Sequence, residues 1–228
     1  MSNRRRIYLL RHGDVSYVSA SGERVPSDTV SLSERGRAEA EAAGAALAEV
    51  AFDRVVTSAL PRTHETADLV LGGRSFPRSV EPGLNEIAPG NVTTLGEPAA
   101  MRRAIVDSFF DADTEGARFF AGERFDEFHA RVARAFDAIL AEPDWSTLLL
   151  VAHGGVNRAI LSRATGPGLA SYGTIEQDSG CINVLDIDAW SESSKRAIVR
   201  LQNFTPYDPA KLASRKTTLE RLFDQFTG

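Results

Sequence analysis

The sequence contains two apolar runs that each end in a histidine followed by glycine. The segment IYLLRHG begins at Ile7 and carries Arg11 and His12 at its end, and the segment LLLVAHGG begins at Leu148 and ends with His153 and two glycines. A charged side chain at the end of a buried strand is costly unless it is paired. These basic residues are therefore expected to face a partner of opposite charge.

A third segment, Arg54–Thr57, is followed after a few residues by Arg62. Ligands of parallel sheets bind beyond the carboxyl ends of the strands. If the three segments are parallel neighbours, two arginines and two histidines converge on one edge of a sheet. Arginine pairs with two phosphate oxygens at once, and glycines let a ligand approach the backbone closely. The residues alone thus predict a site for a phosphate group.

Strands and helices alternate along most of the chain. Helices are predicted after Ser33, over Pro61–Leu71 and after Gly155, from capping residues and apolar spacing. The predicted strands mostly lack polar alternation, which is typical of strands covered on both faces; they are Arg6–Leu10, Arg54–Thr57, Thr147–Ala152, Cys181–Ile187 and Ala197–Leu201. This pattern predicts an α/β fold, a three-layer sandwich with a mostly parallel central sheet flanked by helices.

The alternation breaks between residues 91 and 145, where we expect a helical insertion over the active-site edge of a single domain that spans residues 1–228. A C-terminal amphipathic helix is predicted over 208–228. Seven of the twelve phenylalanines lie in the insertion: Phe109, Phe110, Phe119, Phe120, Phe125, Phe128 and Phe136. Their helical spacing favours a role in packing the insertion onto the core. The alternatives are an apolar lid and a contact between subunits of a homodimer.

Composition excludes several functions. The net charge of -5 and the pI near 5.5 argue against a general nucleic-acid binder. The single cysteine, Cys181, excludes an internal disulfide framework and is consistent with a reducing compartment. No apolar stretch approaches the length of a membrane span or a signal-peptide core. We therefore expect a cytoplasmic protein that binds neither membrane nor nucleic acid.

Five pieces of sequence, two of which contain the histidine–glycine pairs described above, match one known family in order and across most of the chain. They are LLRHGD at Leu9–Asp14, LSERGRAEA at Leu32–Ala40, TSALPRTHETA at Thr57–Ala67, LNEIAPG at Leu84–Gly90 and VAHGG at Val151–Gly155. With these motifs the sequence resembles the histidine phosphatase superfamily, also called the phosphoglycerate mutase-like or RHG-motif family.

The resemblance implies a role for each matching residue. His12 would be the nucleophile and become a phosphohistidine. Arg11, Arg62 and His153 would bind the phosphate oxygens and stabilise their charge during transfer. Glu86 would protonate the leaving oxygen and then activate the water that cleaves the intermediate. This chemistry requires neither a metal nor a cofactor.

The sequence departs from the family pattern near its substrate. Many members carry an asparagine six residues after the nucleophile, where this chain has Val18. One donor is therefore missing, or it is supplied by Ser16, Tyr17 or Ser19. The tryptophan-containing stretch that often follows the catalytic glutamate is replaced by residues 91–94. We expect four residues to contact the substrate: Gly13, Ser16, Tyr17 and Gly154.

The proposed roles also require particular protonation states. The attacking His12 must be neutral, and an acceptor such as a backbone carbonyl near Gly13 must fix its tautomer. A second histidine that faces a phosphate dianion, His153, should have a raised pKa and be cationic. Glu86 must be protonated to act as an acid, which favours an optimum below neutral pH.

These expectations describe a metal-independent phosphatase that hydrolyses a small phosphomonoester through a phosphohistidine. Its partner would be a small phosphorylated metabolite. One alternative is a phosphotransferase of the phosphoglycerate mutase type, which would return the phosphoryl group to a sugar acid. Another is a non-catalytic module that binds a phosphorylated ligand.

Overall fold

The computed structural model describes residues 4–19, 21–23, 25–90, 97–190, 195–213 and 215–227. Within these residues one sheet has the strand order β3-β2-β4-β1-β5-β6. The strands are β1 (Arg5–Arg11), β2 (Arg54–Thr57), β3 (Arg78–Val80), β4 (Thr147–Ala152), β5 (Ile182–Trp190) and β6 (Lys195–Phe204). The pairs β2–β3, β2–β4 and β1–β4 are parallel, and the pairs β1–β5 and β5–β6 are antiparallel. The predicted mostly parallel sheet is confirmed.

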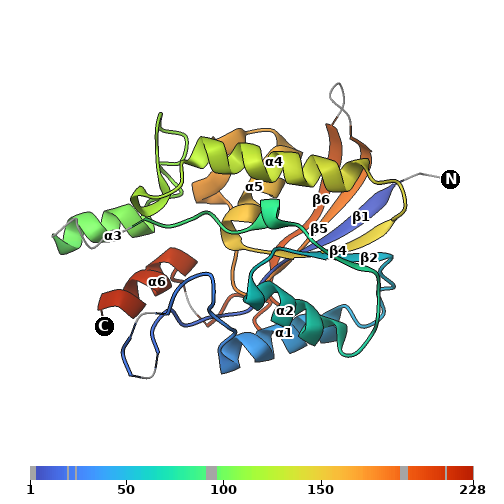
Figure 1. Ribbon diagram of the computed structural model, residues 1–228, viewed down its shortest axis with the longest axis horizontal. Helices are drawn as coiled ribbons and strands as arrows, with labels where there is room; N and C mark the ends of the chain where they lie inside the picture. The colour runs from blue at the N-terminus through green and yellow to red at the C-terminus, as the bar shows by residue number, and fades with distance from the viewer. Residues whose placement is uncertain are drawn as a thin grey trace.

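Helices cover both faces of this sheet. The α-helices are α1 (Glu34–Ala46), α2 (Pro61–Leu71), α3 (Pro98–Val106), α4 (Phe125–Ala141), α5 (Gly154–Thr165) and α6 (Thr218–Thr227). The short 3-10 helices are η1 (Pro82–Leu84), η3 (Phe119–Ala121) and η4 (Gly168–Thr174). Figure 1 shows α1 and α2 on one side of the sheet and α4 on the other, so the expected three-layer sandwich is confirmed.

Alternate side chains of the central strands enter different layers. In β1, Ile7 and Leu9 pack with α4 and α5, whereas Leu10 packs with α1 and α2. In β4, Leu148 and Leu150 likewise pack with α4 and α5. Both faces of these strands are buried, which explains why the sequence shows apolar runs instead of alternation.

Helix ends follow the signals in the sequence. The Ser33 side chain accepts a hydrogen bond from the amide of Gly36 and caps α1. Pro61 occupies the first turn of α2, and Gly72 ends that helix in the left-handed conformation. The predicted bounds of α2 are confirmed.

The predicted start of the C-terminal helix at Asp208 is wrong, because α6 begins at Thr218. The Asp208 carboxylate accepts hydrogen bonds from the amides of Leu212 and Ala213, and Lys211 adopts a left-handed conformation with φ 55°. The side chain closes a turn here and does not start a helix. The side chain of Phe226, which we assigned to the apolar stripe of this helix, lies outside the described residues.

The region of the expected insertion contributes to the main core. Six of the seven phenylalanines are buried in the layer that contains α4 and α5, and Phe110 is exposed. This agrees with the packing role. Residues 91–96, which include the stretch that replaces the tryptophan motif, lie outside the described residues.

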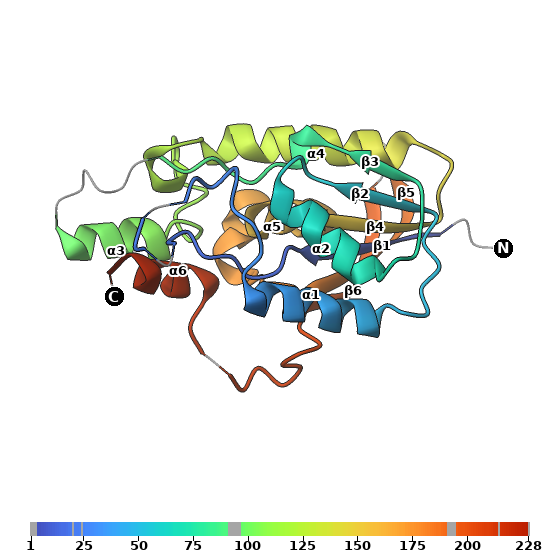
Figure 2. The same ribbon diagram turned by 60° about the horizontal axis from the view of Figure 1, so that its bottom comes forward.

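Two helices lie at the end of the molecule to which the parallel strands point. Helix α3 packs against α6, and Figures 1 and 2 both show the pair far from the N-terminus. Within the described residues, no helix is both long and apolar enough to cross a membrane.

Candidate active site

The register of the sheet brings the ends of three strands together. Arg11 at the end of β1 pairs with Ala152 of β4, and Thr57 at the end of β2 pairs with Val151. The residues that follow β1 and β4 are His12 and His153, and their ring centroids lie 5.2 Å apart. The expected convergence of the three strand ends is therefore present in the fold.

His12 has the tautomer that a nucleophile needs. Its Nδ1 lies 2.7 Å from the carbonyl oxygen of Gly13, which can only accept, so Nδ1 carries the proton and Nε2 the lone pair. Burial lowers the pKa of His12 well below its usual value, and the positive charges of Arg62 and Arg11 lower it further. The imidazole is therefore neutral near pH 7.

His153 is fully buried beside it. Its Nε2 lies 2.7 Å from the hydroxyl oxygen of Ser58, and its Nδ1 has no hydrogen-bond partner among the described residues. Burial, followed by the charge of Arg62, lowers the pKa of His153 well below its usual value. Without a ligand, the protein therefore favours neutral His153, whereas we expected the cationic form. The negative charge of a bound phosphate dianion would be needed to raise the pKa of His153.

Two arginines complete this group of buried donors. Arg62, in the first turn of α2, donates from Nη1 to the carbonyl oxygen of Ser27 at 2.5 Å, and Arg11 donates from Nη1 to the carbonyl oxygen of Gln177 at 2.7 Å. In each side chain the buried Nε has no partner within the described part of the chain. Unsatisfied buried donors are rare, and this arrangement fits an anion.

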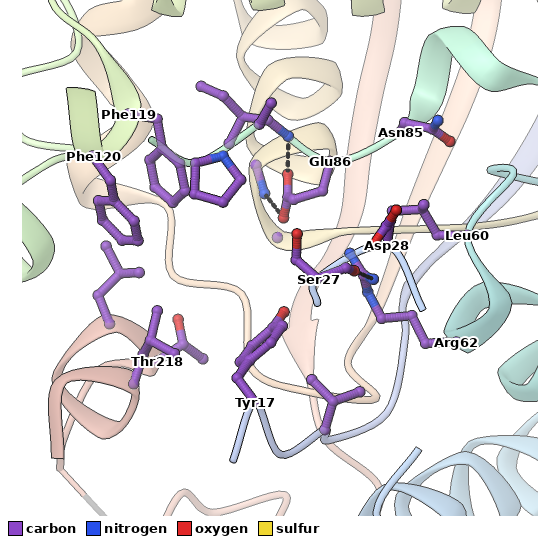
Figure 3. Close-up of a pocket in the computed structure, with 18 of the residues that line it drawn as sticks. Tyr17, Ser27, Asp28, Leu60, Arg62, Asn85, Glu86, Phe119, Phe120 and Thr218 are labelled. Carbon is purple, nitrogen blue, oxygen red and sulfur yellow. Dashed lines mark hydrogen bonds between the residues drawn. The ribbon is translucent and has the colours of Figure 1, made fainter. Parts of the chain in front are cut away.

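Glu86 follows η1 and lies between this group and an aromatic part of the same pocket. One carboxylate oxygen accepts from the amide of Ile87 at 3.0 Å, and the other accepts from the amide of Gly155 at 3.1 Å (Figure 3). A Cβ on Gly155 would lie 2.5 Å from the nearer carboxylate oxygen. The glycine therefore makes room for Glu86 at the start of α5.

The backbone around Glu86 is held by an arginine of α4. Arg131 donates from Nη1 to the carbonyl oxygens of Gly83 and Asn85, at 2.8 and 3.0 Å. Its other nitrogens bind the carboxylate of Glu123. These contacts fix the backbone that directly precedes the catalytic candidate.

Two of the expected substrate contacts have other roles. The Gly13 amide donates to the hydroxyl of Thr66, and a Cβ on Gly13 would lie 2.2 Å from the carbonyl oxygen of Gly36, so this glycine admits helix α1 and not a ligand. Ser16 is exposed, and its hydroxyl donates to the carbonyl oxygen of Val18 at 2.6 Å. Neither residue is among those that line the pocket.

The other two expected contacts do line the pocket. Gly154 lies beside the guanidinium of Arg11, where a Cβ would be 3.4 Å from Nε. Tyr17 is the one of the three candidate donors near Val18 that lines the pocket, and Figure 3 shows it beside Ser27.

Sequence reasoning missed several residues of the site. Ser27 reaches Arg62 from a loop that carries no motif, so only the fold reveals it. Ser58 is the first polar residue after β2 and could have been noticed on that ground. Arg158 follows Gly154 by one helical turn, is almost fully buried, and donates to its carbonyl oxygen at 3.2 Å.

The pocket above these residues has a volume of about 1070 Å³. Arg11, Arg62 and Glu86 line its polar part, whereas His12 and His153 are buried and do not line it. Residues 7–199 of the chain match the sequence pattern of the histidine phosphatase superfamily (branch 1).

Individual proteins are similar over comparable lengths. The chain is 30% identical over 184 residues to an adenosylcobalamin/alpha-ribazole phosphatase of Salmonella typhimurium, covering 80% of this chain and 90% of that protein. It is 29% identical over 166 residues to a protein of Erwinia tasmaniensis named "Probable phosphoglycerate mutase GpmB", covering 70% and 74%. The crystal structure of the alpha-ribazole phosphatase from Shigella flexneri superposes with a TM-score of 0.70 at 28% identity, covering 87% and 96%.

Proposed function

The chain belongs to the histidine phosphatase superfamily, and from this membership we propose that it hydrolyses a phosphomonoester through a phosphohistidine on His12. One observation carries the proposal for this chain. Three buried nitrogen atoms near the neutral His12, namely Nε of Arg11, Nε of Arg62 and Nδ1 of His153, have no hydrogen-bond partner within the described residues. A phosphate dianion would satisfy all three.

In the first step, Nε2 of His12 attacks phosphorus while the bond from phosphorus to the ester oxygen breaks. The leaving oxygen takes the electron pair of that bond and a proton from Glu86. The imidazole gains positive charge, which the hydrogen bond from Nδ1 to the Gly13 carbonyl stabilises. Arg11, Arg62 and His153 bind the three other oxygens as their charge is redistributed.

In the second step, water attacks the phosphohistidine. Glu86, now a carboxylate, accepts a proton from the water while the bond between nitrogen and phosphorus breaks. His12 returns to its neutral form, and inorganic phosphate leaves. Side chains and backbone amides supply the positive charge for both steps, so we propose that no metal or cofactor takes part.

We further propose that the chain is a single domain that acts on a phosphorylated metabolite in the cytoplasm. The lone buried cysteine supports a reducing compartment. The acidic net charge supports the absence of a nucleic-acid partner. Two further expectations remain predictions: the protein does not bind a membrane, and it assembles as a homodimer.

The proposal is tested by trapping the intermediate. The protein is mixed with 32P-labelled phenyl phosphate, quenched in alkali, where phosphohistidine survives, and counted for label bound to protein. We expect label on the wild type and on the His64→Ala control, and none on His12→Ala, which should lose at least about 10³-fold in kcat. EDTA should leave the rate unchanged.

Three outcomes would contradict the proposal. They are label and turnover that persist in His12→Ala, activity that EDTA abolishes, and conversion of 3-phosphoglycerate to 2-phosphoglycerate without release of phosphate. The last result would identify a mutase.

A further inference from the structure

The pocket has an apolar wall that the phosphoryl-transfer chemistry does not use. It is formed by Met101 of α3, Phe109, the pair Phe119 and Phe120 of η3, and Leu219 and Leu222 of α6. The rings of Phe119 and Phe120 are stacked, with centroids 3.9 Å apart and planes tilted by 20°. Phe109 lies against Phe119 at 5.5 Å. The wall therefore offers flat aromatic surface at a pocket that is open to a ligand.

The wall lies on the leaving-group side of the pocket. Figure 3 shows Arg62 on one side, Phe119 and Phe120 on the other, and Glu86 between them. Glu86 protonates the leaving oxygen in the proposed reaction, so the alcohol part of the substrate extends from Glu86 away from Arg62. That direction leads to the aromatic pair.

The position of this wall is tied to the position of Glu86. The backbone of Gly90, four residues after Glu86, packs so closely on η3 that a Cβ would lie 2.4 Å from the carbonyl oxygen of Phe120. The amide of Gly90 donates to the carbonyl oxygen of Phe119. Leaving-group subsite and proton donor thus belong to one packed unit.

The remaining cations of the pocket are already neutralised. Arg131 pairs with Glu123 at 3.0 Å, Arg158 with Glu176 at 3.3 Å. Arg221 of α6 pairs with Asp178 at 2.8 Å. Thus, among the described residues that line the pocket, every arginine other than Arg11 and Arg62 has a carboxylate partner. A second anionic group on the substrate would be taken out of water without compensation.

We infer that this protein acts on phosphomonoesters whose alcohol part is uncharged, flat and apolar, bound between the aromatic pair and α6. The inference rests on the proposed function and replaces the small metabolite expected from the sequence with a bulkier ester. The pocket volume of about 1070 Å³ accommodates such a group, since typical sites for drug-sized ligands span roughly 300–1,000 Å³.

The test compares esters that differ in one property at a time. Phenyl and 2-naphthyl phosphate share an aryl oxygen and differ by one fused ring. Glycerol 3-phosphate and 3-phosphoglycerate differ by a carboxylate. We expect kcat/KM to rise about tenfold or more from phenyl to naphthyl, and to fall at least about tenfold from glycerol phosphate to phosphoglycerate.

Variants connect these preferences to the wall. Phe120→Ala and Leu219→Ala should each reduce the naphthyl-to-phenyl ratio at least about fivefold. Phe110→Ala and Leu212→Ala remove exposed apolar side chains outside the wall and serve as matched controls. Because Phe120→Ala removes a buried ring, its thermal unfolding is measured in parallel, and Leu219→Ala gives the independent second reading.

The inference is overturned if naphthyl phosphate is no better than phenyl phosphate, or if both wall variants lower the two rates equally. These results differ from a failure of the proposed function, in which phenyl phosphate is not hydrolysed or is hydrolysed equally by His12→Ala. Calorimetric binding of the two aryl phosphates to His12→Ala measures the same preference without turnover, and equal affinities would also overturn the inference.

Discussion

At the scale of single residues, two buried imidazoles lie 5.2 Å apart and share two arginines, yet the protein keeps them in different bonding states. His12 is fixed by a carbonyl oxygen, which leaves a lone pair on the other nitrogen. Nε2 of His153 is hydrogen-bonded to the hydroxyl of Ser58, which can donate or accept. His153 can therefore be neutral or cationic without moving. We expect binding of a phosphate dianion to bring a proton to His153 and not to His12.

The low pKa values of this pair predict an acid-sensitive fold. Histidine in the unfolded chain titrates near pH 6.5, and in the folded protein the pKa of both residues is well below that value. Below about pH 6.5 the unfolded state therefore binds more protons than the folded state, and the free energy of unfolding decreases as the pH is lowered. Each histidine contributes up to about 1.4 kcal/mol per pH unit until its folded pKa is reached.

Chemical denaturation at pH 7, 6 and 5 measures this dependence. His153→Asn should show a shallower loss of stability than the wild type across this interval, and His64→Asn is the matched control. Parallel profiles for His153→Asn and the wild type would show that His153 does not carry the effect.

The sequence predicted which residues come together at the strand ends better than it predicted their surroundings. Arg11, His12 and His153 could be found because they interrupt or end apolar runs, which is a local signal. The role of Gly13 could not, because it depends on how close Gly36 of α1 comes to it in space. Ser27 was invisible for the same reason, since no sequence pattern tells which loop carbonyl reaches Arg62.

At the scale of elements, the start of α5 holds the Glu86 carboxylate in place. Its second residue, Gly155, donates its amide to Glu86, and the missing side chain leaves space for the carboxylate. The helix therefore positions Glu86, the proposed proton donor, while His153, proposed to bind the phosphate, directly precedes the helix. One strand–helix junction thus places residues of both proposed steps.

Gly155→Ala should consequently impair protonation of the leaving group. The added Cβ displaces Glu86, so kcat for phenyl phosphate should fall about 10²-fold, the lower range for general acid catalysis. The decrease for 4-nitrophenyl phosphate should be several-fold smaller, because nitrophenolate leaves without a proton. Gly154→Ala is the comparison variant, because the atoms nearest to its Cβ would be Nη1 of Arg158 at 3.3 Å and Nε of Arg11 at 3.4 Å, and not the Glu86 carboxylate. Equal losses with both esters would contradict a role through Glu86.

Element bounds were predictable where capping signals agree with packing, as in α2 and α1. The prediction failed at Asp208, because an aspartate followed by proline is typical of both a helix start and a turn. Strand β3 was missed because it has three residues, of which Arg78 and Val80 are exposed. Its pairing with β2 is decided by the fold and not by an apolar run.

At the scale of the whole molecule, the carboxylate of Asp178 is one of the links between α6 and the sheet. Asp178 accepts hydrogen bonds from Lys211 and from Arg221 of α6, and its other contacts include Asn203 of β6. Burial acts to raise the pKa of Asp178, but the hydrogen bonds from Lys211 and Arg221 lower it to about 2. The carboxylate is therefore ionised over the whole neutral range and anchors the helix that completes the apolar wall.

Asp178→Asn should loosen α6 while the catalytic group stays in place. Loss of a half-buried hydrogen bond between charged groups costs about 1.5–3 kcal/mol, which corresponds to roughly tenfold or faster amide exchange over residues 219–227. Asp224→Asn, which removes an exposed partner of Lys216, is the control. Hydrogen–deuterium exchange measures the difference, and unchanged protection of α6 in Asp178→Asn would contradict the anchoring role.

The strand order carries a last consequence, which concerns how the chain is made. Strand β1 is the first strand in the sequence, yet it lies between β4 and β5, which are formed from residues 147–190. A ribosome therefore releases the apolar IYLL segment and the proposed nucleophile, His12, long before it has made either neighbour of β1. The active centre can assemble only when translation is well past residue 147. Chaperones that shield apolar segments of nascent chains are therefore expected to bind β1, which directly precedes His12.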